Sequence, residues 1–449
     1  MLFNSLAFAI FLPVVTVTFH LLPRRWAWLW LLGSSIYFYA CLIPAYVFVL
    51  GGVVLVDYRA GIQIENATAE RKKLWLCVSL AANLGVLAFF KYYQFLDQTI
   101  DSLSHALGWN YSPSKLKLLL PLGLSFHTFQ SMSYIIEVYR GRQKAERHLG
   151  YYGLYVMYFP QLVAGPIERP QNLLHQLRDP APLSDSLLSG GFRLLLLGFF
   201  KKLVIADRLA PLLQPVFSNP HSAEGGALVL ATMLFSIQIY CDFSGYTDIA
   251  RGTSRLMGID LMRNFNAPYL ASSVRDFWRR WHISLSTWFR EYLFLPLGGS
   301  RVSHRHFYYT NLIIVFGLSG LWHGAAGHYL VWGLFHAGYM IFSDATSLLR
   351  QGIARCMHQV VADGSALTKL VVGLVIILGI FGLWQWVHGG FFGSPVAALC
   401  HAFDWSGDLA RKRTGYVPSQ LLAVLLIITC VVGLSLCRRI GIPVRRLLR

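Results

Sequence analysis

The chain alternates long apolar stretches with short linkers that are rich in arginine and lysine. A helix needs about 20 mostly apolar residues to cross the hydrocarbon core of a bilayer. Stretches of this length predict membrane-spanning helices rather than the core of a soluble domain. They occur near residues 5–22, 27–56, 74–96, 116–137, 187–206, 226–247, 328–345, 368–388 and 418–437, with shorter ones near 152–167 and 307–322.

Basic linkers set the expected orientation of these helices, because Lys and Arg are retained in short cytoplasmic loops. The stretches around 97–114, 207–225 and 389–417 then face outward. The linkers expected in the cytoplasm are Arg24-Arg25, residues 71–73, Arg140 to Arg147, the nine arginines between Arg251 and Arg305, and the tail from Arg438 to Arg449.

This orientation requires that residues 27–56 form a helical hairpin and that 152–167 re-enter the membrane without crossing it. Residues 307–322 and 328–345 must form a pair of crossings. The pattern then predicts about eleven crossings, with the N-terminus outside and the C-terminus inside. The first apolar stretch has no basic residue before it and no small-residue cleavage site, so we expect a retained helix.

Composition supports a multi-pass membrane protein. Of the 449 residues, 55% are hydrophobic and only 13% are charged, whereas about a quarter of a soluble domain is charged. The chain has no internal repeat, so we expect one all-α membrane domain over residues 1–449. Its catalytic motifs lie within about 120–345, and its last crossings at 368–388 and 418–437.

The net charge of +18 comes from 39 Lys and Arg against 21 Asp and Glu. In a membrane protein, such an excess mainly reflects cytoplasmic loops beside anionic lipid, so we expect membrane lipids and no nucleic acid as partners. The seven cysteines have no CxxC spacing and lie mostly in apolar stretches. We therefore expect neither a disulfide framework nor a metal site.

Residues 277–295 have the spacing of an amphipathic helix. Apolar side chains stand at positions 278, 281, 285, 288, 292 and 295, whereas Arg279, Ser286 and Arg290 fall on the opposite side. We expect this helix to lie at the cytoplasmic interface, with His282 beside the apolar side and pointing inward. An interfacial anchor without chemistry has the same pattern.

His323 ends an apolar stretch and is flanked by small residues, with Ser319-Gly320 before it and Gly324-Ala325-Ala326-Gly327 after it. An imidazole titrates near neutral pH, so a histidine inside a membrane protein is a candidate functional group. Small neighbours admit a thin acyl chain, but they also suit plain close packing of helices. Both interpretations can hold at once.

Four segments stand in a fixed order along the chain: YFPQLVAGPIERP at 158–170, YCDFSGYTDIA at 240–250, WRRWHISLSTWFREY at 278–292 and LWHGAA at 321–326. Together they resemble the membrane-bound O-acyltransferases, and among them the branch of bacterial alginate O-acetylation proteins. The similarity extends from Met1 to about residue 345. Glu291 and Gly327-His328 depart from that branch, and the second departure bears on the shape of the chamber expected beside His323.

The resemblance implies a multi-pass O-acetyltransferase of the bacterial inner membrane. His323 would be its catalytic histidine and His282 its second signature polar residue. The donor would be cytoplasmic acetyl-CoA, with no bound cofactor. The acceptor would be an extracytoplasmic polysaccharide, alginate-like or another surface glycan, reached directly or through a periplasmic SGNH-like acetyltransferase partner.

Acyl transfer to a hydroxyl needs a base, and His323 is the candidate because a neutral imidazole in a water-poor chamber suits that task. Acetyl-CoA carries phosphates, which guanidinium groups bind well. Arg275, Arg279, Arg280 and Arg290 are the candidate phosphate ligands. Positive charge retained at the cytoplasmic side is the alternative explanation for each of them.

Other polar residues in apolar surroundings have weaker claims to a catalytic role. Asp242 and Asp248 are six residues apart, too far round a helix to act as paired carboxylates. His127, His328 and His336 favour a structural role, with His336 the main exception because it follows His323 in the same hairpin. A transporter or a non-catalytic export scaffold of a polysaccharide secretion system is the alternative function.

Overall fold

The computed structural model describes residues 1–346 apart from residues 2, 42, 113–120, 122, 220–222 and 224. Within these residues every regular element is a helix, which confirms the all-α prediction for this part of the chain. The crossings predicted at 368–388 and 418–437 lie outside the described residues.

Three described helices are long and apolar enough to span a membrane, with mean hydropathy of 1.6 to 1.7. They are α3 (Ala45–Asn66), α12 (Gly225–Leu256) and a continuous helix over Ala69–Ala106. The last consists of α4 (Ala69–Leu87), the π-helical turn η1 (Ala88–Tyr92) and α5 (Tyr93–Ala106).

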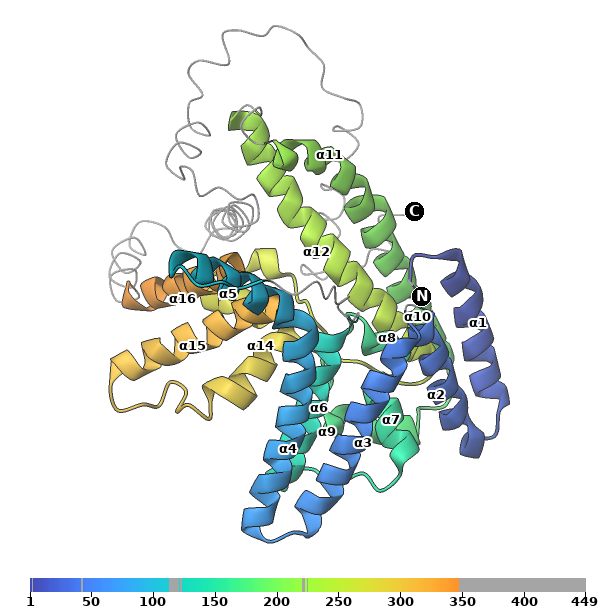
Figure 1. The fold of residues 1–449 in the computed structure, drawn as a ribbon. Helices are drawn as coiled ribbons and strands as arrows, with labels where there is room; N and C mark the ends of the chain where they lie inside the picture. The colour runs from blue at the N-terminus through green and yellow to red at the C-terminus, as the bar shows by residue number, and fades with distance from the viewer. Residues whose placement is uncertain are drawn as a thin grey trace, which may run out of the picture. The chain divides into compact units, whose positions relative to one another are not determined.

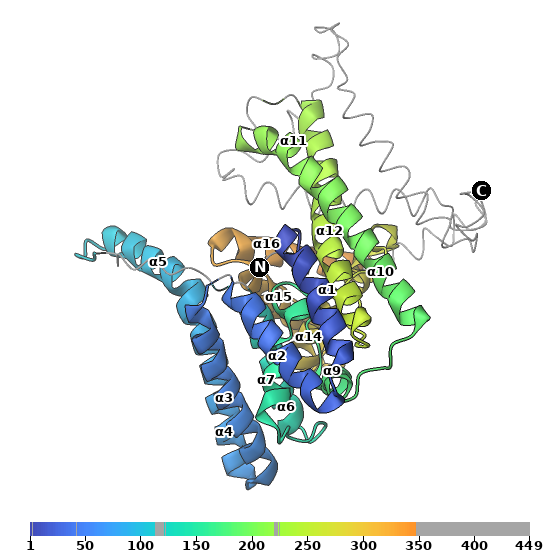
Figure 2. The same ribbon diagram turned by 90° about the vertical axis from the view of Figure 1, so that its right-hand side faces the viewer.

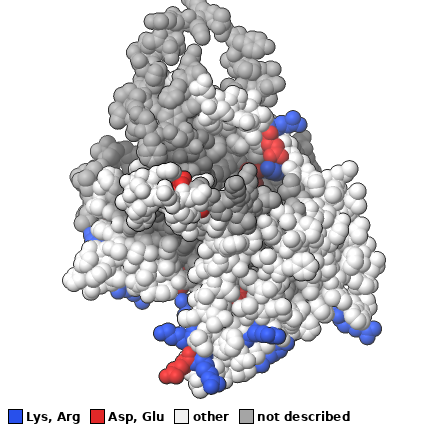
Figure 3. All heavy atoms as spheres, viewed as in Figure 1, with Lys and Arg blue, Asp and Glu red and all other residues white. Residues whose placement is uncertain are grey.

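Many large apolar side chains point outward from the described helices. At most 39% of the residues in the most apolar part of each long helix are buried, and Leu6 and Phe48 are 80% and 82% exposed. Contiguous exposed apolar surface of this kind is unfavourable in water and suits contact with lipid. In Figure 3, Lys and Arg gather at the end of the α3–α4 pair, whereas the sides of these helices are nearly uncharged.

The described residues divide into two compact units. The first contains Met1–Phe199, Phe243–Phe265 and the stretch that begins at His282. The second contains Phe200–Asp242 and Asn266–Trp281. The prediction of one domain concerns the whole chain and stays a prediction.

The N-terminal part of the first unit is built from neighbouring hairpins. The predicted hairpin over 27–56 appears as two helices, α2 (Arg24–Ala40) and α3, which pack against each other. That both of them cross the membrane stays a prediction. α3 and α4 lie side by side in Figures 1 and 2, and α6 (Leu124–Tyr139) packs against both. α1 (Leu6–Leu21) packs against α2.

A buried carboxylate joins α3 to α4. Asp57 is fully buried and accepts hydrogen bonds from Ser79 Oγ at 2.5 Å and Asn83 Nδ2 at 2.9 Å. Buried polar groups need such partners, because an unpaired group in hydrocarbon costs several kcal/mol. This cluster therefore fixes the register of the two helices.

The stretch at 152–167 does not form one helix. It contains α7 (Leu149–Met157) and the single turn α8 (Phe159–Leu162), whose second residue is Pro160. α9 (Pro170–Arg178) and α10 (Asp185–Phe199) follow. A broken helix at this point is compatible with re-entry, whose depth in the membrane stays a prediction.

The second unit has its own apolar core. η2 (Phe200–Ala206), α11 (Asp207–Ser218) and the first part of α12 contribute Ile205, Leu209, Leu213, Leu234 and Cys241 to it. The same unit holds η4 (Pro268–Leu270) and α13 (Val274–Arg280). Lys202 bridges Asp207 and Asp242 at 2.8 and 2.5 Å, so Asp242 is engaged in an ion pair.

Four helical elements complete the first unit around the candidate site: α14 (Ile283–Phe289), the π-helical turn η5 (Arg290–Phe294), α15 (Arg305–His323) and α16 (Gly327–Ala345). Left-handed backbone at Gly298 and Gly299 ends the segment after η5. Glycine suits both positions, since it adopts positive φ without steric cost.

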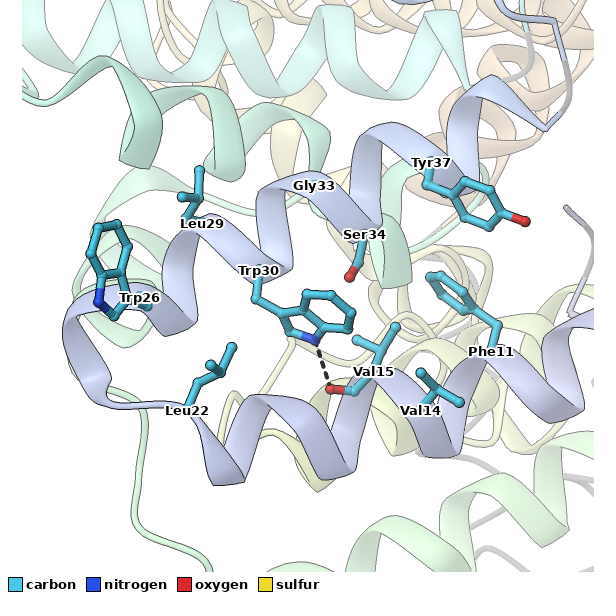
Figure 4. A pocket seen from close by; sticks show the side chains of 10 residues that line it. All are labelled: Phe11, Val14, Val15, Leu22, Trp26, Leu29, Trp30, Gly33, Ser34 and Tyr37. Carbon is cyan, nitrogen blue, oxygen red and sulfur yellow. Dashed lines mark hydrogen bonds between the residues drawn. The ribbon is translucent and has the colours of Figure 1, made fainter.

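An apolar groove of about 500 Å³ lies between α1 and α2. Figure 4 shows its lining, with Trp30 Nε1 donating to the Val15 carbonyl at 3.1 Å. The lining is almost entirely hydrocarbon and contains no histidine or charged side chain. The groove therefore suits a hydrocarbon chain rather than a proton-transfer reaction.

Candidate active site

His323 is the last residue of α15, at the point where α15 turns into α16. The two helices touch through glycine. A Cβ added to Gly320 would lie 2.2 Å from the Tyr329 carbonyl oxygen, and one added to Gly333 would lie 2.2 Å from the Phe316 carbonyl oxygen. The small residues around His323 therefore serve close helix packing, as one of the two interpretations of the sequence expected.

Aromatic rings enclose the imidazole of His323, which is half-buried. Its ring centroid lies 5.0 Å from that of Trp322 and 5.0 Å from that of Trp332, both in edge-to-face geometry. Trp332 in turn lies 4.5 Å from the fully buried His336. The Trp332 ring thus contacts both His323 and His336.

The helix predicted over 277–295 is interrupted, so the prediction of one continuous amphipathic helix is wrong. α13 ends at Arg280 and α14 begins at Ile283. Between them, His282 has left-handed backbone angles of φ 42° and ψ 55°. Such angles are rare for residues other than glycine and cluster at functional sites.

Asn264 is the physical reason for this interruption. Its carbonyl oxygen accepts from the Ile283 N–H at 2.9 Å, and its side-chain oxygen accepts from the Ser284 N–H at 3.2 Å. Thr247 Oγ1 lies 3.4 Å from Asn264 Nδ2 and accepts its hydrogen bond. The first N–H groups of α14, which have no partner inside the helix, are thereby satisfied by a separate loop.

The side chain of His282 points inward, as predicted, and is only 3% exposed. Its ring lies 4.7 Å from Phe243 and 6.2 Å from Phe126. Burial, and secondarily the nearby His323, hold the pKa of His282 well below its ordinary value. Nε2 has no hydrogen-bond partner among the described residues. His282 therefore provides a neutral, buried imidazole with an open nitrogen.

Trp322 lies between the two signature histidines. Its ring centroid is 5.9 Å from His282 and 5.0 Å from His323. The indole is only 6% exposed and packs with Phe129 and Trp288 in one core cluster. Forty residues lie between the two histidines in the sequence, yet both imidazoles lie beside the Trp322 ring.

The four candidate phosphate-binding arginines occupy two elements. Arg275, Arg279 and Arg280 lie on α13 in the second unit, and Arg290 begins η5 in the first. Arg275, Arg279 and Arg290 are exposed. Arg280 donates to Asp276 Oδ1 at 2.8 Å, so its charge is partly engaged. A joint site for all four stays a prediction.

Glu291 has a structural explanation. It accepts a hydrogen bond from Arg169 Nε at 3.1 Å, and the Arg169 guanidinium lies 5.1 Å from the centre of the Tyr292 ring. The departure from the related branch at this position is therefore compatible with an ion pair that joins η5 to the segment before α9.

The sequence interpretation passed over Asn264, Trp332 and Lys91. No motif or periodic pattern in the sequence marks Asn264 or Trp332 as part of a functional site. Lys91 did carry a signal, because it is a charged residue inside the apolar stretch 74–96. Ionisable residues at such places are functional candidates by default.

Comparison with known proteins identifies the family. Residues 148–366 match the sequence model of the membrane-bound O-acyltransferase family. The chain is 39% identical over 350 residues to the probable alginate O-acetylase AlgI of Pseudomonas aeruginosa, covering 77% of this chain and 66% of that protein. It is 38% identical over 352 residues to AlgI of Pseudomonas putida, covering 78% and 72%.

The chain belongs to the membrane-bound O-acyltransferase family. It is also 35% identical over 369 residues to the peptidoglycan O-acetyltransferase of Helicobacter pylori, covering 75% of this chain and 69% of that protein. The family and the apolar helices together establish an acyl-transferring membrane protein. The predicted resemblance is confirmed.

Proposed function

We propose that this protein transfers an acetyl group from cytoplasmic acetyl-CoA across the membrane toward hydroxyl groups of an extracytoplasmic polysaccharide. The polysaccharide is alginate-like or another surface glycan. Transfer occurs directly or through a periplasmic SGNH-like acetyltransferase. The protein would work in the bacterial inner membrane as a multi-pass protein with about eleven crossings.

The observation that carries this proposal is the meeting of His282 and His323 around Trp322. The relatives whose names include alginate or peptidoglycan O-acetylation support the acetyl group and the glycan acceptor. The half-buried His323 is the better placed of the two to meet an acceptor, since His282 is almost fully buried.

The reaction needs one proton transfer and one exchange of bonds. The imidazole of His323 takes the proton of the acceptor hydroxyl while the hydroxyl oxygen attacks the thioester carbonyl. The new C–O bond forms, the C–S bond breaks, and the coenzyme A thiolate leaves. The proton on His323 then passes to that thiolate, which restores the neutral base. A serine hydroxyl of the partner replaces the sugar hydroxyl in the relayed route.

Turnover of acetyl-CoA by the purified full-length protein tests the proposal. The assay supplies isotope-labelled acetyl-CoA and alginate oligosaccharides, and measures free thiol and label on the sugar. We expect acceptor-dependent thiol release and ester-linked label on the oligosaccharide. A folded protein that releases no thiol, with either the oligosaccharide or a periplasmic SGNH-like acetyltransferase as acceptor, contradicts acetyl transfer and favours a transporter or scaffold.

The donor site gives a second expectation. Replacing Arg275, Arg279 and Arg290 together by glutamine should raise the KM for acetyl-CoA about tenfold and leave the KM for the acceptor unchanged, because the lost guanidinium groups bind only donor phosphates. The measurement is initial rate against donor concentration at two salt concentrations. Arg301→Gln, an exposed change in the same basic region, is the matched control. An unchanged donor KM would leave these arginines as orientation signals.

Orientation is tested by cysteine labelling. Cysteines placed at Arg142 and Arg305 should be protected from a membrane-impermeant reagent added outside, and one placed at Ser222 should react, because basic linkers stay in the cytoplasm. Cys41 and Cys77 are exposed, so the background must have all native cysteines replaced by serine. Outside labelling at Arg305 would contradict the proposed cytoplasmic entry of the donor.

A further inference from the structure

Two consecutive polar side chains project from the π-helical turn η1, within the mainly apolar stretch 74–96. They are Lys91 and Tyr92. π-helical turns are rare and occur frequently at functional sites, because the widened turn changes the direction of the side chains that follow. A lysine inside such a helix is costly unless it has partners.

Both side chains reach the end of α15 that carries His323. Tyr92 Oη donates to the Leu321 carbonyl oxygen at 2.6 Å. Lys91 Nζ donates to the Trp322 carbonyl oxygen and to Ser125 Oγ, the latter at 3.2 Å. The ammonium also lies 5.5 Å from the centre of the Trp322 ring. No carboxylate among the described residues forms an ion pair with Lys91.

These contacts satisfy carbonyl groups that α15 itself leaves open. The last carbonyls of a helix have no partner within it, and a cation near them is favoured by the helix dipole. In α15 the Gly320 carbonyl accepts from the Gly324 N–H at 3.4 Å. The next two carbonyls accept from Tyr92 and Lys91, which lie 229 and 231 residues earlier in the chain. The turn before His323 is therefore held by a different helix.

We propose that Lys91 is a positioning residue for His323, acting together with Tyr92 by fixing the last turn of α15 and the Trp322 ring against which the imidazole packs. The proposal rests on the acetyl transfer proposed above. Lys91 touches neither donor nor acceptor in this scheme. Its effect falls on the rate of the chemical step, since a small displacement of a catalytic group can slow a reaction about a hundredfold.

Lys91→Met tests the proposal, because methionine keeps the length of the side chain but removes the charge and the donor. We expect kcat for thiol release from acetyl-CoA to fall about 10- to 100-fold while the donor KM changes less than about twofold. Lys91→Arg, which retains charge and donors, should restore most of kcat. Tyr92→Phe should lower kcat about three- to tenfold, and the double variant should lose less than the product of the single effects because both act on one turn.

Lys73→Met is the matched control, since Lys73 is an exposed lysine on the preceding helix α4. A folded Lys91→Met variant with wild-type kcat overturns the proposal, as does a loss confined to the donor KM. If Lys91→Met does not fold, Tyr92→Phe decides, and its unchanged kcat overturns the proposal. A wild-type protein that releases no thiol instead contradicts the proposed function, so the two failures are distinct.

Discussion

His323→Ala should reduce acetyl transfer by about 10²- to 10⁴-fold, which is the usual contribution of a general base. The variant should still fold, because His323 is only half-buried. The tight contact of α15 with α16 is made by glycines rather than by the imidazole. The measurement is ester-linked acetate on the surface polysaccharide of cells, together with thiol release by the purified variant and its level in the membrane.

His306→Ala provides the matched control for this prediction. It removes an exposed imidazole from the first turn of α15, at the opposite end of that helix from His323, where His306 packs beside Phe307 at 4.2 Å between ring centroids. We expect near wild-type transfer from this variant. If a well-folded His323→Ala protein also acetylated at near wild-type rate, the mechanism with His323 as the base would be wrong.

The helices of this fold were predictable where an apolar stretch of sufficient length is bounded by proline or glycine. The hairpin over 27–56 and the pair over 307–322 and 328–345 appear where expected. In each case a short segment with proline or glycine separates two apolar stretches, and such residues end helices. No tertiary information is needed for such boundaries.

The interruption at His282 was not predictable from the same pattern. Apolar residues continue at 278, 281, 285 and 288, so helical periodicity passes straight through the break. The deciding contacts come from Asn264, which lies in a loop and competes for the first N–H groups of α14. Periodicity reports which side of a helix is apolar, and it carries no information about such long-range hydrogen bonds.

The site itself was only partly visible in the sequence. The two histidines were identified from their motifs, but nothing in the motifs indicates that Trp322 separates their rings or that Lys91 and Tyr92 hold the end of α15. The contacts of Lys91 and Tyr92 join segments more than 200 residues apart. A single charged residue in an apolar stretch is the one signal that pointed to Lys91.

The left-handed backbone of His282 suggests that the site accepts strain to place a buried imidazole. Left-handed angles cost a residue with a Cβ about 1–2 kcal/mol, whereas glycine adopts them freely. His282→Ala and His282→Gly both remove the imidazole and its packing, so their difference isolates the backbone. We expect both variants to lose most acetyl transfer, and the glycine variant to be more stable than the alanine variant by about 1 kcal/mol. The measurement is the apparent melting temperature of each purified variant in detergent, beside its kcat.

Ala267→Gly is the control for that experiment. Ala267 has a φ of 45°, and with His282 it makes up the non-glycine residues of positive φ in the described part of the chain. Removing the backbone strain at Ala267 should raise the melting temperature above that of the wild-type protein. The kcat should stay at the wild-type value, because no imidazole is removed. If the alanine and glycine variants of His282 melted at the same temperature, its left-handed backbone would store no strain. If they also retained wild-type kcat, the buried imidazole would have no part in the transfer.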